Sequence, residues 1–286
     1  MKVAALQMVS STALQTNLEQ ALVLLRQAAA QGAELALLPE YFCLLGRRDT
    51  DKLSIQEPYG DGPIQRFLAS SARELGLWIV GGSLPLTLAE VGLPAADRGS
   101  RVYNSTLVYS PQGECICRYD KIHLFRFDNG RERYDESAVL RAGSQPARFE
   151  LPSRDGQRWQ IGLSICYDLR FPELYRELTK PPCDLVCVPS AFTYTTGRAH
   201  WETLLRARAI ENLERLVVAR AFDVLGKEQL GRHRMRRDRG TPAHMHTGEQ
   251  ATFSFADIPS SGYVTPGDND SKNRVSSRIL FHIKGL

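Results

Sequence analysis

The fold of this chain is decided by residues 161–178, which read IGLSICYDLRFPELYREL. The apolar run Ile161–Ile165 is typical of a buried strand, and the segment from Phe171 to Leu178 is typical of a helix. Between them lie Cys166 and a polar turn, 167–170. A thiol at a strand end that faces a helix start lies where backbone N–H groups and the helix dipole favour an anion. We therefore predict a nucleophile at Cys166, with a buried structural thiol as the alternative.

Strands and helices alternate on both sides of this stretch. Apolar residues at helical spacing predict helices over 14–30, 63–75 and 201–214. Short apolar runs predict strands over 3–8, 33–38, 78–82, 184–188 and 216–219, and a hairpin of 103–109 and 114–119. Because the two kinds of element are interleaved throughout, the sequence predicts an α/β layered domain.

The composition is that of an ordinary globular protein. The 286 residues are 43% hydrophobic and 24% charged, enough for one large domain, and a net charge of +4 requires neither a nucleic-acid nor a membrane partner. No apolar run approaches the roughly 20 residues of a membrane span. Gln7 interrupts the apolar start, which argues against a signal peptide. We expect a cytoplasmic protein whose six cysteines are reduced.

Two further polar residues follow predicted strands. Glu40 comes after the strand 33–38 through Pro39, and Lys121 comes after the strand 114–119. In open α/β sheets, ligands bind at the carboxyl ends of the strands, so we expect Glu40, Lys121 and Cys166 to meet in one crevice. Taken singly, a Glu or Lys just past a strand is more often a solvated loop residue. The combination of the three carries the prediction.

The three side chains have complementary chemistry. A free thiol titrates near ~8.5, so a base or a favourable field must activate it at neutral pH. Glu40 would take the thiol proton, and Lys121 with a backbone N–H after Cys166 would stabilise the negative charge formed on attack at a carbonyl or nitrile carbon. Glu40 would then protonate the departing ammonia and activate the water that cleaves the thioester.

Three segments resemble the motifs of a known family in their order and placement. They are LLPE at 37–40, YDKIHLF at 119–125 and ICYDLRFPEL at 165–174, and they resemble the nitrilase, or carbon–nitrogen hydrolase, superfamily. The resemblance implies a catalytic set of Glu40, Lys121 and Cys166, supported by Glu136, which positions the lysine and the substrate. It also implies a four-layer α-β-β-α sandwich, commonly dimeric, that hydrolyses an amide to a carboxylate and ammonia without a metal or organic cofactor.

Residues 166–176 and 189–202 resemble most the amidase branch of this family, which includes deaminated glutathione amidase and omega-amidase. We expect a small linear amide with a distal carboxylate, because arginines can hold a carboxylate by bidentate hydrogen bonds. The expected substrate-binding residues are Tyr134, Tyr167, Arg170, Phe192 and Thr193, with Arg47, Arg48 and Tyr194 as further candidates. The expected partners are this amide and a second copy of the chain, with no nucleic acid and no membrane.

The resemblance ends near Arg220. We predict a carbon–nitrogen hydrolase domain over 1–220 and a divergent segment over 221–286, in which 231–240 is basic and 260–277 is mostly small and polar. This segment lacks the alternation of apolar and polar residues that is typical of strands. It could be a divergent tail, an altered reading frame or a true replacement, and in each case the last strands would be missing or altered. Sheet edges and apolar faces would then be uncovered. An inactive or poorly folded remnant and a ligand-binding module without turnover therefore stay open as alternatives.

Other functional interpretations have weaker support. Cys115 and Cys117 are too close in sequence for a typical zinc pair, and Cys183 with Cys187 stands alone within a predicted strand. The histidines of 244–246 are typical of a solvated loop. The arginines of 232–239 could contact phosphates, but no aromatic stacking pattern accompanies them, which favours a solvated tail.

Overall fold

The computed structural model describes residues 1–87, 100–128, 130, 133–192, 194–212, 215–223 and 252–257. For 194, 195, 215–223 and 252–257 only the backbone is described. Thr193, the basic run 231–240, the histidines of 244–246 and the polar stretch 260–277 lie outside the described residues, as does most of the predicted segment 221–286. The boundary near Arg220 therefore stays a prediction.

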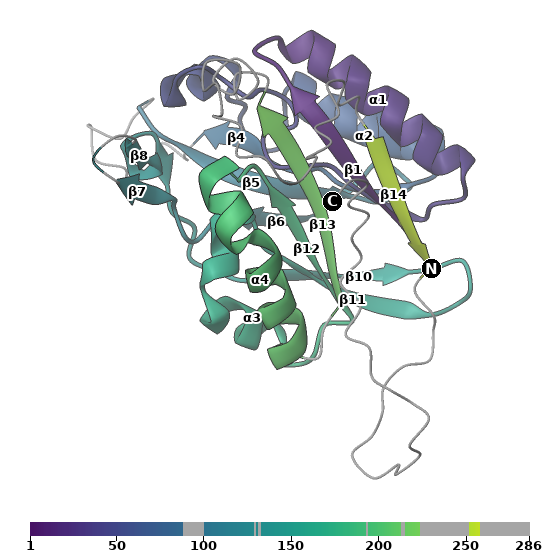
Figure 1. Ribbon diagram of the computed structural model, residues 1–286. Helices are drawn as coiled ribbons and strands as arrows, with labels where there is room; N and C mark the ends of the chain where they lie inside the picture. Colours follow the sequence, from purple (N-terminus) through teal and green to yellow (C-terminus); the bar gives the residue numbers. More distant parts are fainter. Residues whose placement is uncertain are drawn as a thin grey trace, which may run out of the picture.

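The first sheet is formed by the N-terminal half of the chain together with one late strand (Figure 1). Its strands are β1 (Lys2–Ser10), β2 (Leu35–Leu37), β3 (Trp78–Val80), β4 (Leu84–Thr87), β5 (Val102–Tyr109), β6 (Cys115–Asp120), β9 (Leu140–Arg141) and β14 (Thr252–Asp257). β1, β2 and β3 are parallel, whereas β5 runs antiparallel to β3, β4 and β6. Lys121 directly follows β6, and Glu40 lies three residues after the end of β2.

The second sheet carries the candidate nucleophile. Its strands are β10 (Ala147–Pro152), β11 (Arg158–Leu163), β12 (Leu185–Ser190) and β13 (Arg215–Asp223). β11, β12 and β13 are parallel. The last three residues of β13 pair with Met8, Val9 and Ser10 of β1, which joins the two sheets at one corner. A separate hairpin consists of β7 (Arg126–Asp128) and β8 (Arg133–Asp135).

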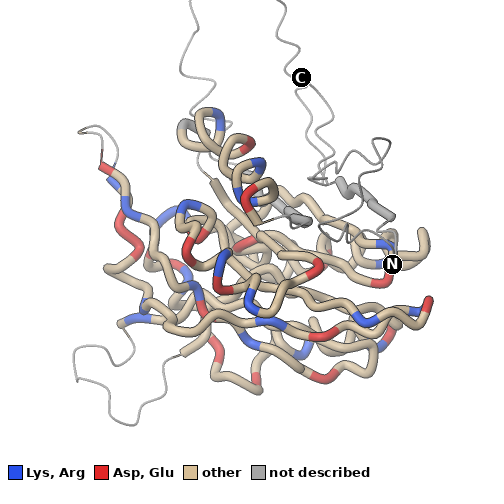
Figure 2. Tube along the Cα trace, turned by 90° about the horizontal axis from the view of Figure 1, so that it is seen from below, with Lys and Arg blue, Asp and Glu red and all other residues tan. Residues whose placement is uncertain are grey.

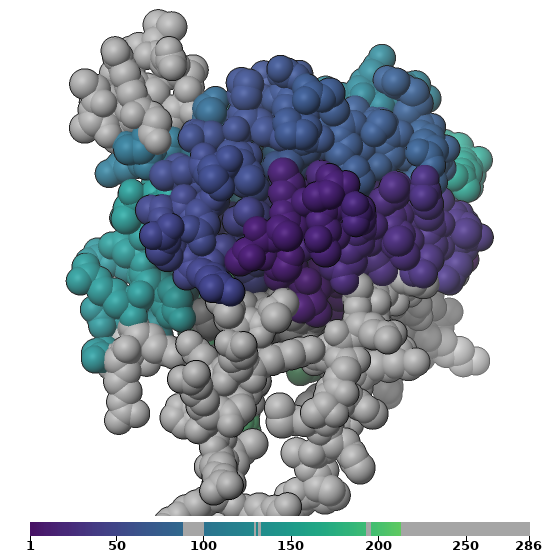
Figure 3. All heavy atoms as spheres, turned by 90° about the horizontal axis from the view of Figure 1, so that it is seen from above, coloured from purple at the N-terminus to yellow at the C-terminus, as the bar shows by residue number. Residues whose placement is uncertain are grey.

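Helices cover the outer face of each sheet. α1 (Leu14–Ala30) and α2 (Pro63–Leu75) pack on the first sheet, and α3 (Pro172–Leu178) and α4 (Tyr194–Asn212) pack on the second (Figure 1). Seen from above, the first third of the chain, coloured purple to blue, forms the outer face on the α1 side (Figure 3). Among the described residues, 3-10 helices span Asp49–Ile55, Glu136–Ala138 and Cys166–Arg170.

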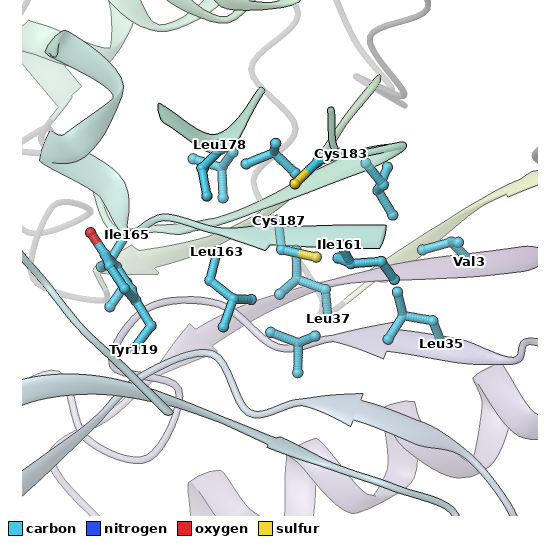
Figure 4. Close-up of a cluster of buried hydrophobic side chains, with 14 of the residues drawn as sticks. Val3, Leu35, Leu37, Tyr119, Ile161, Leu163, Ile165, Leu178, Cys183 and Cys187 are labelled. Atoms are coloured by element: carbon cyan, nitrogen blue, oxygen red, sulfur yellow. The ribbon is translucent and has the colours of Figure 1, made fainter. Parts of the chain in front are cut away.

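Strand alternation explains the layers. In β1, Ala4 and Leu6 belong to the apolar cluster under α1 and α2, whereas Val3 and Ala5 belong to the cluster that contains the second sheet. In Figure 4, Val3 and the leucines of β2 lie opposite Ile161, Leu163 and Cys187 of the second sheet. The two sheets therefore pack face to face between two helical layers, and the predicted α-β-β-α sandwich is confirmed.

Sequence patterns located most elements but missed some. The predicted helices 14–30 and 63–75 match α1 and α2, while α4 begins at Tyr194, earlier than predicted. The interpretation that the segment after Arg220 lacks strand alternation is wrong at 252–257, which reads TFSFAD and alternates over its first four residues. This strand pairs antiparallel with residues 2–7 of β1 and so covers part of its edge.

Basic and acidic residues are interspersed along the described ranges of the chain, as the trace in Figure 2 shows. Within those same ranges, no helix combines the length and the apolar character that crossing a membrane would need. No group of three or more metal-ligating side chains is assembled there either.

Candidate active site

Cys166 lies on a sharp turn just beyond β11. It opens the 3-10 helix Cys166–Arg170 with φ of +48°, a left-handed conformation that is uncommon for a residue other than glycine. The turn is closed by its own residues: the Ile165 N–H donates to Asp168 Oδ2 at 2.9 Å, and the Asp168 N–H donates to the Ile165 carbonyl at 3.0 Å. Cys166 is 8% exposed, so its thiol is nearly enclosed.

Glu40 and Lys121 form a buried ion pair. Each is 1% exposed, and Lys121 Nζ donates to Glu40 Oε1 at 3.0 Å. Asn104 on β5 contacts both residues. Its side-chain NH2 group donates to Glu40 Oε1 at 3.0 Å, and its backbone carbonyl accepts from the backbone N–H of Lys121 at 2.9 Å. The ends of β2 and β6 are thereby fixed against each other.

Glu136 is the second carboxylate on the lysine. Lys121 Nζ lies 3.1 Å and 2.9 Å from its two oxygens, so the ammonium bridges Glu136 and Glu40. The Phe125 N–H donates to Glu136 Oε2 at 2.7 Å, and the Tyr41 hydroxyl donates to Oε1 at 3.3 Å. The structure therefore brings Glu136 into direct contact with Lys121.

The electrostatics of the site keep the thiol protonated at rest. Burial raises the pKa of Cys166 well above its ordinary value, and the charge of Glu40 raises it further, while Lys121 opposes this shift. The expectation that backbone dipoles favour an anion at this sulfur is therefore outweighed. α3 begins only at Pro172, so its dipole does not start at Cys166.

Lys121 and Glu136 are stabilised in their charged forms. Burial alone would lower the pKa of Lys121, but Glu136 and Glu40 raise it well above its ordinary value. Burial would raise the pKa of Glu136, but Lys121, the Phe125 N–H and Lys52 together lower it below its ordinary value. The site thus holds a permanent ammonium between two carboxylates, next to a neutral thiol.

Asp168 connects the nucleophile turn to the lysine loop. It is fully buried, and besides the Ile165 N–H it accepts from the Tyr119 hydroxyl at 2.6 Å and the His123 N–H at 3.0 Å. His123 Nδ1 lies 2.7 Å from the same carboxylate. Because Ile165 follows a strand of the second sheet and Tyr119 lies on β6 of the first, this one side chain fixes Cys166 relative to Lys121.

Aromatic rings surround the loop after Lys121. Phe125 lies 5.2 Å from the Tyr167 ring and 5.8 Å from the Tyr134 ring, measured between centroids. The guanidinium of Arg170 lies 5.7 Å from the Tyr167 ring centre and 5.9 Å from that of Phe192. The structure thus assembles four of the five expected substrate-binding residues into two connected groups, and Thr193 lies outside the described residues.

Some site residues were missed by the sequence patterns, and one candidate is not brought in. Arg48 pairs with Asp51 at the surface, with its side chain 81% exposed, so it does not join the catalytic group. The patterns did not identify Tyr41, Lys52, Asn104 or Asp168. Asp168 could have been identified from its position, because it lies two residues after Cys166 in the segment 161–178.

The four-layer fold and the buried cysteine, lysine and carboxylates define a hydrolase of the nitrilase superfamily. The chain belongs to the carbon–nitrogen hydrolase family, whose sequence profile matches residues 2–226. It is 38% identical over 211 residues to a deaminated glutathione amidase of Synechocystis, which is 73% of each chain. It is 35% identical over 208 residues to an omega-amidase of Danio rerio, covering 68% of this chain and 65% of that one.

A solved structure supports the same assignment. The amidase of Nesterenkonia sp. AN1, in a form whose active-site cysteine has undergone Michael addition of acrylamide, superposes with a TM-score of 0.60 and 26% identity. The match covers 77% of this chain and 78% of that one. Together, the family and the amidase names of these relatives identify the chain as a carbon–nitrogen hydrolase of the amidase type.

Proposed function

We propose that the chain hydrolyses a small linear amide through a Cys166 thioester. The amide carries a distal carboxylate, as in deaminated glutathione and the omega-amides. The observation that carries the proposal is the Lys121 ammonium, which bridges Glu40 and Glu136 beside the Cys166 thiol. A base, a fixed positive charge and a nucleophile at one place are the groups that amide hydrolysis needs.

The first half of the reaction would form the thioester. Glu40 takes the thiol proton as Cys166 Sγ attacks the amide carbon, so no free thiolate has to exist beforehand, in keeping with the raised pKa of this thiol. Negative charge moves to the amide oxygen, where Lys121 Nζ and the Tyr167 N–H stabilise it. Protonated Glu40 then donates to the amide nitrogen and the C–N bond breaks, so ammonia leaves from a primary amide and an amine leaves from a substituted amide such as deaminated glutathione.

The second half would release the acid. Glu40, again a carboxylate, removes a proton from water as the water oxygen attacks the thioester carbon. The C–S bond breaks, the carboxylic acid departs and the sulfur regains its proton from Glu40. Glu136 takes no proton in this scheme: its role is to hold Lys121 at the position where the oxyanion forms.

Arg170 supports the preference for a carboxylate at the far end of the substrate. Its guanidinium is half-buried near the Tyr167 and Phe192 rings, next to the residue that follows the nucleophile. A guanidinium can bind a carboxylate through two parallel hydrogen bonds, and partial burial strengthens that interaction. Tyr134 and Tyr167 would line the path of the aliphatic chain between the two ends.

The test is a hydrolysis assay on a panel of linear amides with and without a distal carboxylate, which follows ammonia release from primary amides and amine release from substituted amides such as deaminated glutathione. We expect turnover of the carboxylated amides, its loss in Cys166→Ala and Lys121→Ala, and a higher KM in Arg170→Gln. A cooperatively melting sample without turnover across the panel would contradict the proposal and favour an inactive remnant or a binding module. Equal turnover of uncharged amides would contradict the substrate preference alone.

We further propose a homodimer that works in the cytoplasm. All six cysteines lie within the described residues and none forms a disulfide, which suits a reducing compartment. The family resemblance implies a dimer formed through the outer helices, and Ile210, which is 60% exposed on α4, is the residue at which we test it. Light scattering after size-exclusion chromatography tests the dimer, with Ile210→Asp expected to shift it toward the monomer.

A further inference from the structure

A second buried lysine lies behind the catalytic group. Lys52, on the 3-10 helix Asp49–Ile55, is 8% exposed, and its Nζ lies 3.4 Å from the Tyr41 hydroxyl and 4.7 Å from the centre of the Tyr41 ring. Its acidic neighbour Asp49 is 3.8 Å away, at the edge of normal ion-pair distance, and that side chain is half-exposed. The reaction scheme above gives Lys52 no part, so its burial requires another explanation.

Tyr41 connects this lysine to the site. It has φ of +53°, and the strained backbone is held by a hydrogen bond from the Tyr41 N–H to Ser83 Oγ at 3.0 Å. Successive side chains of an extended segment point to opposite sides, whereas here both Glu40 and Tyr41 contact the group around Lys121. The Tyr41 hydroxyl accepts from Lys52 and donates to Glu136 Oε1.

These contacts form a continuous polar chain from Lys52 through Tyr41, Glu136 and Lys121 to Glu40. The two carboxylates are then matched by two ammonium groups in a region nearly closed to water. Without Lys52, one buried negative charge would have no counterpart, which is costly at low dielectric. Lys52 is among the groups that lower the pKa of Glu136.

We propose that Lys52 and Tyr41 are positioning residues, which fix the Glu136 carboxylate in its ionised form and in the orientation that holds Lys121 toward Glu40. The inference rests on the amidase function proposed above. Both residues act through Glu136, because the Tyr41 hydroxyl donates to its carboxylate and Lys52 lowers its pKa. The charged and titratable groups that act on Lys52 are Asp49 on its own helix, Tyr41 and Glu40 after β2, Lys121 after β6, and Glu136.

The experiment compares Lys52→Met, Lys52→Arg and Tyr41→Phe with the full wild-type chain. Lys180→Met is the matched control, because Lys180 is 69% exposed and pairs only loosely with Glu177 at 3.4 Å. Two profiles are measured: kcat/KM against pH on the best substrate, and the rate of Cys166 alkylation by iodoacetamide against pH. Alkylation needs no substrate, so it reports on the site even where the proposed amidase function fails.

We expect Lys52→Met to shift the acidic limb of kcat/KM upward by about one pH unit, because Glu136 would be protonated more easily. We also expect alkylation at neutral pH to slow several-fold, because the site loses positive charge and the pKa of Cys166 rises. Tyr41→Phe shifts both profiles in the same direction by less. Lys52→Arg retains the wild-type limb, and Lys180→Met changes neither profile.

Three results would overturn the proposal. The first is that folded Lys52→Met, or Tyr41→Phe, has the same two pH profiles as the wild type. The second is that the pH profiles of Lys52→Arg are displaced as far as those of Lys52→Met. The third is a uniform loss of kcat without displacement of either profile, which would indicate a structural role only. Should Lys52→Met fail to melt cooperatively, Tyr41→Phe decides, since it removes a single hydroxyl group.

Discussion

Replacing Asp168 with asparagine tests whether one carboxylate holds the two halves of the site together. Asp168 Oδ2 accepts from the Tyr119 hydroxyl and the Ile165 N–H, and Oδ1 accepts from the His123 N–H. An asparagine keeps one acceptor oxygen and directs an NH2 group at the other donors. In either orientation of the amide, at least one buried backbone N–H loses its acceptor.

The cost can be estimated from these contacts. A buried donor without a partner costs about 1–3 kcal/mol, and hydrogen bonds to a charged acceptor lie at the upper end of that range. We therefore expect Asp168→Asn to lower the free energy of unfolding by about 2–3 kcal/mol. At about 2–4 °C per kcal/mol for a domain of this size, Tm falls by roughly 4–12 °C. Loosening of Cys166 against Lys121 should reduce kcat by about 10–100-fold.

Urea denaturation and thermal melts measure the stability change, and ammonia release measures kcat. Asp61→Asn is the matched control, because the Asp61 side chain is 75% exposed and its ion pair with Arg66 lies at the surface. That variant should stay within about 0.5 kcal/mol of wild type. The same small change in Asp168→Asn would refute the reasoning.

Three further predictions follow from other contacts. Burial and Glu40 raise the pKa of Cys166 well above that of a free thiol, so the rate of alkylation by iodoacetamide should keep rising above about pH 9 instead of levelling there; a plateau below about pH 9 would contradict this. Gly82→Ala should destabilise the fold by about 2 kcal/mol or more and should reduce kcat. Gly82 has φ of +55°, and an added Cβ would lie 2.1 Å from the Pro39 carbonyl oxygen, next to Glu40. A variant that melts like the wild type would contradict this prediction. Glu57→Ala should cost about 2 kcal/mol in a urea titration, since buried Glu57 accepts from the Ile64 and Gln65 N–H groups at the start of α2; an unchanged midpoint would show that water replaces it.

Local patterns predicted the elements whose signals lie within a few residues. α2 has Pro63 at its first turn and Gly76, with φ of +59°, after its last residue, and both limits were predicted from the sequence. β10 was not predicted, although its sequence, ARFELP, alternates apolar with charged residues and the structure buries Phe149 and Leu151. Short strands such as β9, with two residues, carry too little pattern to identify.

The candidate site could be predicted only from the order of strands and loops along the sequence. Glu40, Lys121 and Cys166 could be placed because each follows a recognisable strand. The strands belong to two stacked sheets and not to one open sheet, which the patterns alone did not reveal. Lys52 could not be found, because a lone lysine in a polar stretch is typical of a solvated loop and its burial depends on the fold around it.

The position of β1 has a consequence for how the protein is made. Residues 2–7 of β1 pair with β14, and residues 8–10 pair with the end of β13, so β1 is synthesised more than 200 residues before these partners. About 250 residues separate β1 from β14, which is among the most non-local pairings a chain of this length can have. At about 5–20 residues per second, translation leaves that edge of β1 unpaired for roughly 12–50 s. During that interval the nascent chain exposes an apolar strand edge, so chaperone binding is expected to matter most before residue 257 emerges from the ribosome.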